Sequence, residues 1–593
     1  MSSNQFVLAY ACDRPDGMSD RELIIRLDAA TEHLRGIAPN VNRVHVGGAR
    51  IGFAVWKFED PGCQWPAVSR RPDEAAAWLH VPAVAGGPED GVNAIDLSRD
   101  ITSGAIDRAQ MGAPCATVYW NKSGLNIAND RMGMVRLYEF DVPNFGKIWS
   151  SRQGLAHIFG GMAPRIEQST WSEMATLGWP VHGDTHLGNG KQLGPGVIVR
   201  ADNNAEVSTS SDLNEWMNSI LDGSVPTVAE GAQSMIHTLE TLKWWRGKPS
   251  ADLSGGKDSR VTAAAAIEAG VVDTVRTVNT DPGEVETVRE LLSRSGDQVT
   301  HRVDEVKQPK PPEGGAYARY MSMQRSWEGA YNALSAYRAP TFTTYRPSTT
   351  PRINGLGGEA LQGQTQVGSI SRAKLEGQGA EAGRDHLVGL ATARAEGADE
   401  SAIEAVTVAV DQFAEMAVGR GMNNAFMVVD YFYHFSKMPF WAHPQGTNGT
   451  ILPLYSPQLL PRTMWSLKNY SEYGELHRAL LREIKPSWAS VPFYKSAPGS
   501  RTVTRMWQND DWPEMAQMVL DNVGPLPTFS RESVLNVVEQ IREGKARPKH
   551  EFVFNRVMWE VTFREYAREI EQAAALTSAR VASVRGSTAM GDR

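Results

Sequence analysis

The stretch from Ala251 to Gly270, ADLSGGKDSRVTAAAAIEAG, constrains the fold more than any other part of the sequence. A short apolar run ends at Leu253, two glycines open a turn, and an alanine-rich segment follows until Gly270. This order predicts a strand, a loop and a helix. Glycines let the backbone approach an anion closely, and N–H groups at the start of a helix face it. The stretch therefore predicts a phosphate-binding loop.

An ordinary P-loop needs Gly-Lys followed directly by Ser or Thr, but here Asp258 follows Gly256-Lys257. The segment SGGKDS instead resembles the SGGxDS loop of the N-type ATP pyrophosphatases, which include the asparagine synthetase-like amide-forming ligases. The resemblance implies that the loop holds the pyrophosphate of ATP while a carboxylate attacks the α-phosphate, giving an acyl-adenylate. A plain Gly-Gly turn explains the glycines, but not Ser254, Asp258 and Ser259. The residues that the resemblance assigns to ATP are Leu253, Ser254, Gly255, Gly256, Lys257, Asp258, Ser259 and Gly355.

A second glycine-rich segment, RINGLGGEALQG at 352–363, resembles the GxGxDE loop of the same family. In that family an acidic residue of this loop joins the Asp of the first loop in holding Mg²⁺. The resemblance implies that Asp258 and Glu359 hold the metal, and oxygen ligands of this kind suit Mg²⁺. The alternative is a glycine-rich surface turn with an incidental Glu. Leu356 stands where β-lactam synthetase has the tyrosine of its base dyad, so that base is missing.

Lys495, in the segment PFYKS, matches the lysine that stabilises developing negative charge in the family. Lys485 is a nearby rival for this role. The aromatic run 430–443 occupies the region where the family builds its substrate pocket, which makes Asp430, Tyr433 and His434 weaker candidates for substrate contact or a base. Aromatic runs are more often core than site. The segment 362–383, rich in Gly, Gln, Ser and Ala, is typical of a mobile loop, either a lid or a simple connector.

The first 202 residues consist of short strand patterns separated by Gly, Pro and Asp/Asn turns, with a helix expected at 19–34. The segments 124–140 and 185–199 resemble, in order, the DRxG and LPPG segments of class II glutaminase domains. Such a domain uses an N-terminal cysteine whose own amine is the base. Here Ser2 occupies that place and the nearest cysteine is Cys12, so the resemblance implies that glutamine is not hydrolysed. The amine must then come with the substrate. The alternatives for Ser2 are a disordered terminus without a role and an Ntn-type serine nucleophile.

These observations predict an α/β protein with an N-terminal Ntn-type (class II glutaminase-like) αββα domain at 1–205. Residues 203–212 are predicted to form a linker. A C-terminal doubly wound parallel-sheet ATP-pyrophosphatase domain with added helices is predicted at 206–576, and a disordered tail at 577–593. In the second domain, strands at 274–280 and 297–303 and a helix at 284–296 follow the loop, which places SGGKDS at the carboxyl end of a parallel strand.

The bulk composition limits the partners. A length of 593 residues indicates more than one domain, and a net charge of −8 disfavours a nucleic-acid partner. No apolar run approaches a membrane span, and the run FVLAYAC is not a signal peptide. The three cysteines, Cys12, Cys63 and Cys115, are far apart, which favours free thiols in the cytoplasm over a zinc site or disulfides.

Within the asparagine synthetase-like ligases the chain most resembles the lasso-peptide cyclases. The resemblance implies that ATP and Mg²⁺ activate an Asp or Glu side chain of a precursor peptide, and that the peptide's N-terminal amine then closes a macrolactam. Its partners would be the precursor peptide, a leader-peptide-binding protein and a leader peptidase. The alternatives are a ligase like β-lactam synthetase, an ammonia-dependent asparagine synthetase, and a nucleotide-binding pseudo-synthetase without activity.

Overall fold

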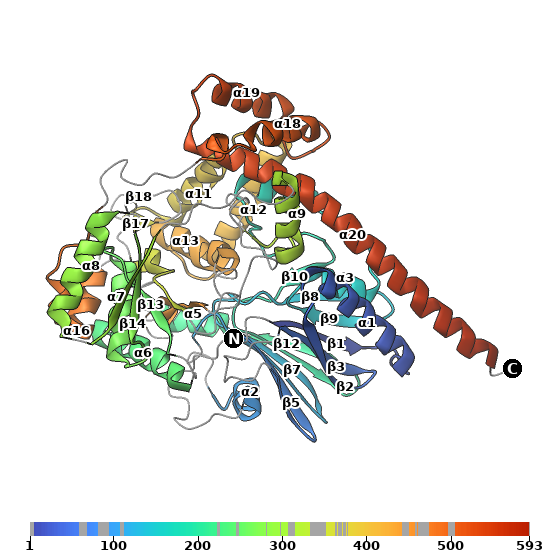
Figure 1. Cartoon of the computed structure of the whole chain (residues 1–593). Coiled ribbons are helices and arrows are strands. Elements are labelled where there is room, and N and C mark those ends of the chain that lie inside the picture. Colours follow the sequence, from blue (N-terminus) through green and yellow to red (C-terminus); the bar gives the residue numbers. More distant parts are fainter. Residues whose placement is uncertain are drawn as a thin grey trace.

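The structure is a computed structural model. It describes residues 5–58, 68–80, 94–106, 112–221, 226–244, 248–279, 281–296, 298–305, 315–331, 352–361, 364–365, 370–371, 375, 377–441, 450–456, 459, 474–495 and 505–591. Ser2, Cys63 and much of the glycine-rich segment 362–383 lie outside these residues. Within the described part the protein is a mixed α/β structure with two six-stranded antiparallel sheets, a five-stranded parallel sheet and a two-stranded ribbon, as Figure 1 shows.

Residues 5–211 supply both antiparallel sheets. The first has the order β10-β8-β9-β1-β3-β2, with β1 (Gln5–Cys12), β2 (Val41–Gly47), β3 (Ile51–Phe58), β8 (Tyr138–Val142), β9 (Gly146–Ser150) and β10 (Gly190–Gln192). The second has the order β12-β11-β7-β6-β5-β4, with β4 (Val68–Arg71), β5 (Glu74–Leu79), β6 (Ala116–Asn121), β7 (Gly124–Asn129), β11 (Val197–Asp202) and β12 (Val207–Ser211). The helices here are α1 (Asp20–Ile37), α2 (Ala94–Ser103), α3 (Gln153–Gly160) and α4 (Gln168–Thr176).

The two sheets pack face to face, with helices on both outer faces. Strand β1 shows how the sequence produces these layers, because its side chains alternate between two cores. Leu8 and Tyr10 pack under α1 and α3, whereas Val7 and Ala9 face the second sheet. Helix α2 covers the outer face of the second sheet. The order is therefore helix, sheet, sheet, helix.

The parallel sheet has the order β15-β14-β13-β16-β19 and contains the SGGKDS loop. Its strands are β13 (Ser250–Asp252), β14 (Thr274–Asn279), β15 (Thr300–Glu305), β16 (Arg352–Ile353) and β19 (Thr450–Ile451). Helices α6 (Val228–Glu240), α7 (Asp258–Glu268), α8 (Pro282–Ser295), α16 (Glu475–Ile484) and α17 (Pro486–Ala489) surround it. The predicted strand at 274–280 and helix at 284–296 are confirmed as β14 and α8.

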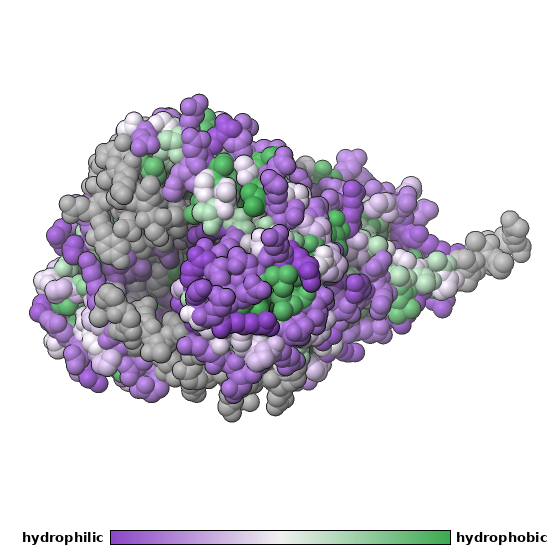
Figure 2. All heavy atoms as spheres, turned by 90° about the horizontal axis from the view of Figure 1, so that it is seen from above, coloured by the Kyte–Doolittle hydropathy of each residue, from purple (hydrophilic) through white to green (hydrophobic). Residues whose placement is uncertain are grey.

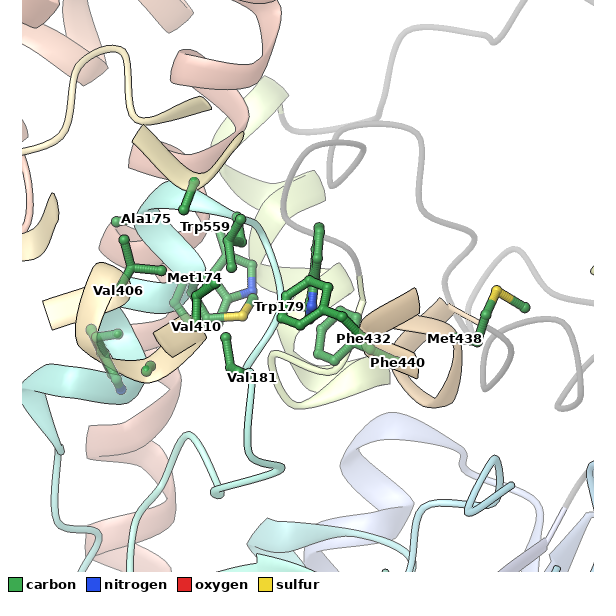
Figure 3. Close-up of a cluster of buried hydrophobic side chains, with 14 of the residues drawn as sticks. Met174, Ala175, Trp179, Val181, Val406, Val410, Phe432, Met438, Phe440 and Trp559 are labelled. Carbon is green, nitrogen blue, oxygen red and sulfur yellow. The ribbon is translucent and has the colours of Figure 1, made fainter. Parts of the chain in front are cut away.

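A third group of helices belongs to the carboxyl-terminal half of the chain and extends to the antiparallel sheets. Its members are α5 (Leu213–Leu221), α9 (Gly315–Trp327), α11 (Ala380–Arg394), α12 (Glu400–Gly419), α13 (Ala425–Phe432), the π-helix η6 (Tyr433–Lys437), α18 (Trp512–Val523), α19 (Arg531–Arg542) and α20 (Pro548–Gly591). Figure 3 shows one part of their shared core, in which Met174 and Trp179 meet Val410, Phe432 and Trp559. Because residues 171–187 and these helices fill one core, the two halves of the chain are packed together.

Two sequence expectations are wrong. The predicted linker at 203–212 contains strand β12, whose residues pair with β11 along the edge of the second sheet. The predicted disordered tail is helical as far as Gly591, because α20 continues through it. Val581 and Val584 of that helix are buried, and Arg585 forms an ion pair with Glu22 on α1. These contacts order a segment whose composition alone is typical of disorder.

The exposed apolar residues are scattered. Figure 2 shows small hydrophobic patches among hydrophilic residues on the face seen from above. Three large exposed examples, Val408, Met416 and Val418, lie on α12. No helix in the described ranges has the length and apolar character needed to cross a bilayer. Single exposed apolar residues of this kind are normal on a globular protein.

A buried carboxyl on α4 leads to a prediction about pH. Glu173 is 4% exposed and accepts a hydrogen bond from the Val181 N–H, and burial raises the pKa of its carboxyl to about 8. The folded protein therefore holds a proton that the unfolded chain releases near pH 4.5, so this residue's stabilisation declines as the pH rises from there to about 8. We expect Glu173→Gln to unfold at the wild-type temperature at pH 4 and at a higher temperature than the wild type at pH 8. If Glu173→Gln and the wild type unfolded at the same temperature at both pH values, this prediction would be wrong.

Candidate functional site

The SGGKDS loop connects β13 to α7 at the carboxyl end of the parallel sheet. Two serines close the loop: the Ser254 and Ser259 hydroxyls are 2.7 Å apart, and the Ser254 Oγ accepts a hydrogen bond from the Gly256 N–H at 3.1 Å. Gly255 must be glycine, since a Cβ there would lie 2.6 Å from the Cβ of Tyr494. The loop thus has the shape that the sequence predicts, with the first turn of α7 directly behind it.

The second glycine-rich segment packs against the first. It follows β16, the parallel neighbour of β13, so both segments leave the same edge of the sheet. A Cβ on Gly355 would lie 2.5 Å from the Ser259 N, and one on Gly358 would lie 2.2 Å from the Asp258 Cγ. Gly355 therefore allows its backbone to touch that of the first loop, and Gly358 allows close contact with the Asp258 side chain. This contact brings the Glu359 segment onto the carboxylate of Asp258.

Each of the two predicted metal-binding carboxylates has a buried partner. His477 on α16 is fully buried, and its Nε2 lies 2.6 Å from Asp258 Oδ1. Burial lowers the pKa of His477, while the neighbouring Asp258 opposes that shift, so we assign a neutral ring that donates from Nε2. Lys257 Nζ is 3.9 Å from the same oxygen of Asp258. One oxygen of Asp258 is thereby fixed by the protein.

Glu359 has a different partner. The Tyr433 hydroxyl, at the start of the π-helix η6, donates to Glu359 Oε2 at 3.2 Å. Burial raises the pKa of Tyr433 well above its usual value, and the charge of Glu359 raises it further. The phenol therefore stays protonated, which makes Tyr433 a hydrogen-bond donor and not a base. Because Gly358, the residue before Glu359, touches Asp258, the Asp258–His477 and Glu359–Tyr433 pairs lie in one site.

Arg260 joins the loop to the segment that carries Lys495. Its guanidinium is fully buried and donates to the carbonyl oxygens of Gly255 and Val491, each at 2.7 Å, and to that of Pro492 at 3.1 Å. The Tyr494 N–H donates to the Gly255 oxygen at 2.8 Å. Lys495 therefore directly follows Tyr494, whose backbone is hydrogen-bonded to the loop, and the Lys495 side chain is exposed.

Other candidates have different surroundings. The rival Lys485 is buried, with its Nζ 5.8 Å from the centre of the Trp488 ring. Leu253 donates its N–H to the Arg276 oxygen, and its own carbonyl oxygen accepts from the Thr277 hydroxyl, so both backbone groups are hydrogen-bonded to β14. Leu356 packs against the helical core. His434 is buried, and its Nδ1 lies 3.4 Å from the Tyr455 hydroxyl.

The site suits a phosphate with a hard cation. Among the described residues, no group of three or more His, Cys, Asp or Glu side chains could hold a metal ion by itself. Mg²⁺ is usually held by only one or two carboxylates, and phosphate oxygens and water complete its shell. Asp258 and Glu359 fit that pattern, and the glycine contact at Gly358 leaves room for no side chain between their two segments. The fold and the site together define a candidate phosphate-binding site at the edge of a parallel sheet.

The sequence did not identify His477 or the Tyr433–Glu359 hydrogen bond. A weak signal exists for His477, which interrupts the apolar face of α16 formed by Leu476, Leu480 and Leu481. A polar residue on such a face usually has a buried partner. For Tyr433, the aromatic run that contains it points equally to core and to site.

The comparisons with known proteins do not identify the function of this chain. No protein-family model and no curated protein matches the sequence. Two similar solved structures are described as an allosteric regulatory enzyme of purine biosynthesis and as the glutamine PRPP amidotransferase of B. subtilis complexed with ADP and GMP. Each is 9% identical over 52% of this chain, covers 82% or 83% of its own length, and has a TM-score of 0.22. At that TM-score the likeness supports no conclusion about the activity of this chain.

Proposed function

We propose that this protein is an ATP-dependent ligase that forms amide bonds through an acyl-adenylate. The observation that carries the proposal is the contact between the SGGKDS loop and the Gly355–Glu359 segment at the carboxyl ends of β13 and β16. Two carboxylates beside a glycine-rich loop are suited to a nucleotide with its metal, and the loop sequence resembles that of AMP-forming ligases. In the same proposal, the helix-flanked pair of antiparallel sheets is an Ntn-type domain.

The residues of the site would divide the work as follows. The loop N–H groups and the start of α7 would bind the pyrophosphate of ATP. Asp258 and Glu359 would hold Mg²⁺, which neutralises phosphate charge when bound. His477 and Tyr433 would keep these carboxylates oriented. Lys495 would stabilise negative charge at the α-phosphate, held there by the Tyr494–Gly255 hydrogen bond and by Arg260.

The overall reaction is balanced without another reagent. A substrate carboxylate attacks the α-phosphate, and pyrophosphate leaves. The substrate amine then attacks the acyl carbon, AMP leaves, and the amine loses a proton. In the specific form that we propose, both groups belong to one precursor peptide, as in lasso-peptide cyclases, and the product is a macrolactam. A leader-peptide-binding protein and a leader peptidase would act with it.

The test combines full-length protein, ATP and Mg²⁺ with candidate peptides or free amino acids, and measures AMP, ADP and pyrophosphate. Pyrophosphate release that depends on a peptide with a free amine and an Asp or Glu supports the cyclase, and the peptide should lose the mass of one water. The same peptide with an acetylated N-terminus should still be adenylated but not cyclised. Release that needs a free amino acid supports a β-lactam- or asparagine-type ligase. ADP as the product, or no release with any substrate, contradicts the proposal.

His477 provides a prediction for this mechanism. His477→Phe preserves an aromatic ring next to Phe493 but removes the hydrogen bond to Asp258. Loss of a group that orients a metal ligand usually costs about 10- to 100-fold in metal affinity or activity. We expect a loss of that size in kcat/KM for ATP·Mg, measured by pyrophosphate release. The control His237→Phe changes an exposed histidine on α6 and should match the wild type. Equal activity of both variants would show that Asp258 needs no fixed orientation.

A further inference from the structure

Lys437 is an unusual lysine next to the proposed site. It lies at the end of the π-helix η6 and is only 8% exposed. Its Nζ lies over three aromatic rings, 4.3 Å from the centre of Trp441, 5.1 Å from Tyr433 and 6.0 Å from Trp179. Aromatic faces attract a cation, but they do not neutralise its charge. The side chain therefore remains a cation in a largely apolar place.

A second cation lies near the same tryptophan. The Arg394 guanidinium, at the end of α11, is 5.9 Å from the Trp179 ring centre. It acts on Lys437 as a repelling charge. Figure 3 shows Trp179 beside Phe432 and Phe440 in the core cluster. The positive charges of Lys437 and Arg394 thus both lie near the Trp179 ring. Their repulsion raises the energy of the site unless an anion binds between them.

The described residues provide no such anion. Within them, no carboxylate forms an ion pair with Lys437 or with Arg394. The charge of Glu359 acts on Lys437 without forming an ion pair with it. Glu359 already accepts the Tyr433 hydroxyl. Burial, with the repulsion from Arg394, lowers the pKa of Lys437 to about 8, so the amine is still mostly protonated at pH 7.

We propose that Lys437 and Arg394 bind a carboxylate of the acyl substrate beside Trp179. Lys437 lies over the Tyr433 ring, and the Tyr433 hydroxyl contacts Glu359, so the site is close to the loop that would hold the nucleotide. A planar guanidinium and an ammonium are matched to a carboxylate, which each can bind by charge-assisted hydrogen bonds. This inference rests on the proposed ligase function, because it assigns the class of substrate: an acidic molecule held by its negative charge.

The test measures occupancy directly. Full-length protein is treated briefly with acetic anhydride, and acetylation of Lys437 is measured by mass spectrometry at increasing concentrations of succinate. Occupancy lowers acetylation by a factor of one plus the ligand concentration over Kd, so about threefold at twice Kd. Succinamide, which has the same shape without charge, should not protect Lys437. Lys485 is a matched control, since it is also 8% exposed and lies over one tryptophan ring, and its acetylation should not change.

Variants identify the second cation and the source of the anion. Arg394→Gln should weaken protection of Lys437 by succinate, whereas Arg384→Gln, on the same helix but paired with Asp411, should not. Protection by inorganic phosphate or ATP·Mg but not by succinate would overturn the carboxylate assignment and give the site to the nucleotide. No protection by any anion would also overturn it. Protection without AMP formation from any substrate would preserve the anion site and overturn the ligase function instead.

Discussion

Replacing Asp258 by alanine is expected to reduce AMP and pyrophosphate formation by about 100-fold or more. Asp258 is the first residue of α7, touches Gly358 across the two loops, and is oriented by His477. A carboxylate that holds a metal on a phosphate supplies several kcal/mol of charge stabilisation, and each 1.36 kcal/mol is about tenfold in rate. The rate of pyrophosphate release at saturating peptide and ATP is the measurement.

The matched control for this variant is Asp273→Ala. Asp273 is an exposed aspartate just before β14, and its only ion pair among the described residues is a 3.9 Å contact with Lys248. It should retain wild-type activity, and both variants should unfold near the wild-type temperature. If Asp258→Ala released pyrophosphate as fast as Asp273→Ala, the loop would not be the catalytic centre, and the proposed ligase function would be wrong.

Arg260→Met is expected to lose both stability and activity. Arg260 is fully buried, and its removal takes one donor from the carbonyl oxygens of Gly255, Val491 and Pro492. The Gly255 oxygen keeps the Tyr494 N–H as a donor, and Pro492 is exposed to water, so Val491 is the buried group that loses most. A buried group that loses its partner costs about 1–3 kcal/mol, so we expect the free energy of unfolding to fall by about 2 kcal/mol. Urea denaturation followed by circular dichroism measures this change. Activity should fall too, because only the Tyr494–Gly255 hydrogen bond then holds the Lys495 segment against the loop.

Two further variants separate the role of Arg260 from a general effect of losing an arginine. Arg482→Met removes an exposed arginine of α16 and should stay within about 0.5 kcal/mol of the wild type. Arg260→Lys keeps the charge but cannot reach three carbonyl groups with one ammonium, so it should recover little stability. Wild-type stability of Arg260→Met would mean that the loop and the 491–495 segment are held together by other contacts.

The sequence predicts those parts of the fold whose conformation depends on residues close together in the chain. The order of strand, glycine loop and alanine-rich helix around Gly255 places the loop and the start of α7 correctly. The Ser19 cap likewise marks the start of α1. In both cases one short segment determines its own conformation through turn, capping and burial preferences.

Contacts between distant segments could not be predicted in this way. His477 and Asp258 are 219 residues apart, and Tyr433 and Glu359 are 74 apart. Their meeting depends on which helix packs on which strand, and one sequence does not encode that in any local pattern. The same holds for β12 and for the end of α20, where polar composition indicated a linker and disorder. Edge pairing with β11 and ion pairs with α1 supply the missing order.

Helix α20 has a consequence for how the protein assembles. It packs on α1, α3 and α4 as well as on α9 and α18, and Ile570 and Tyr566 reach Gly154 at the start of α3. Of all the described elements it is the last to leave the ribosome. The antiparallel layers, which are synthesised before this helix, therefore keep one flank uncovered until α20 has been made.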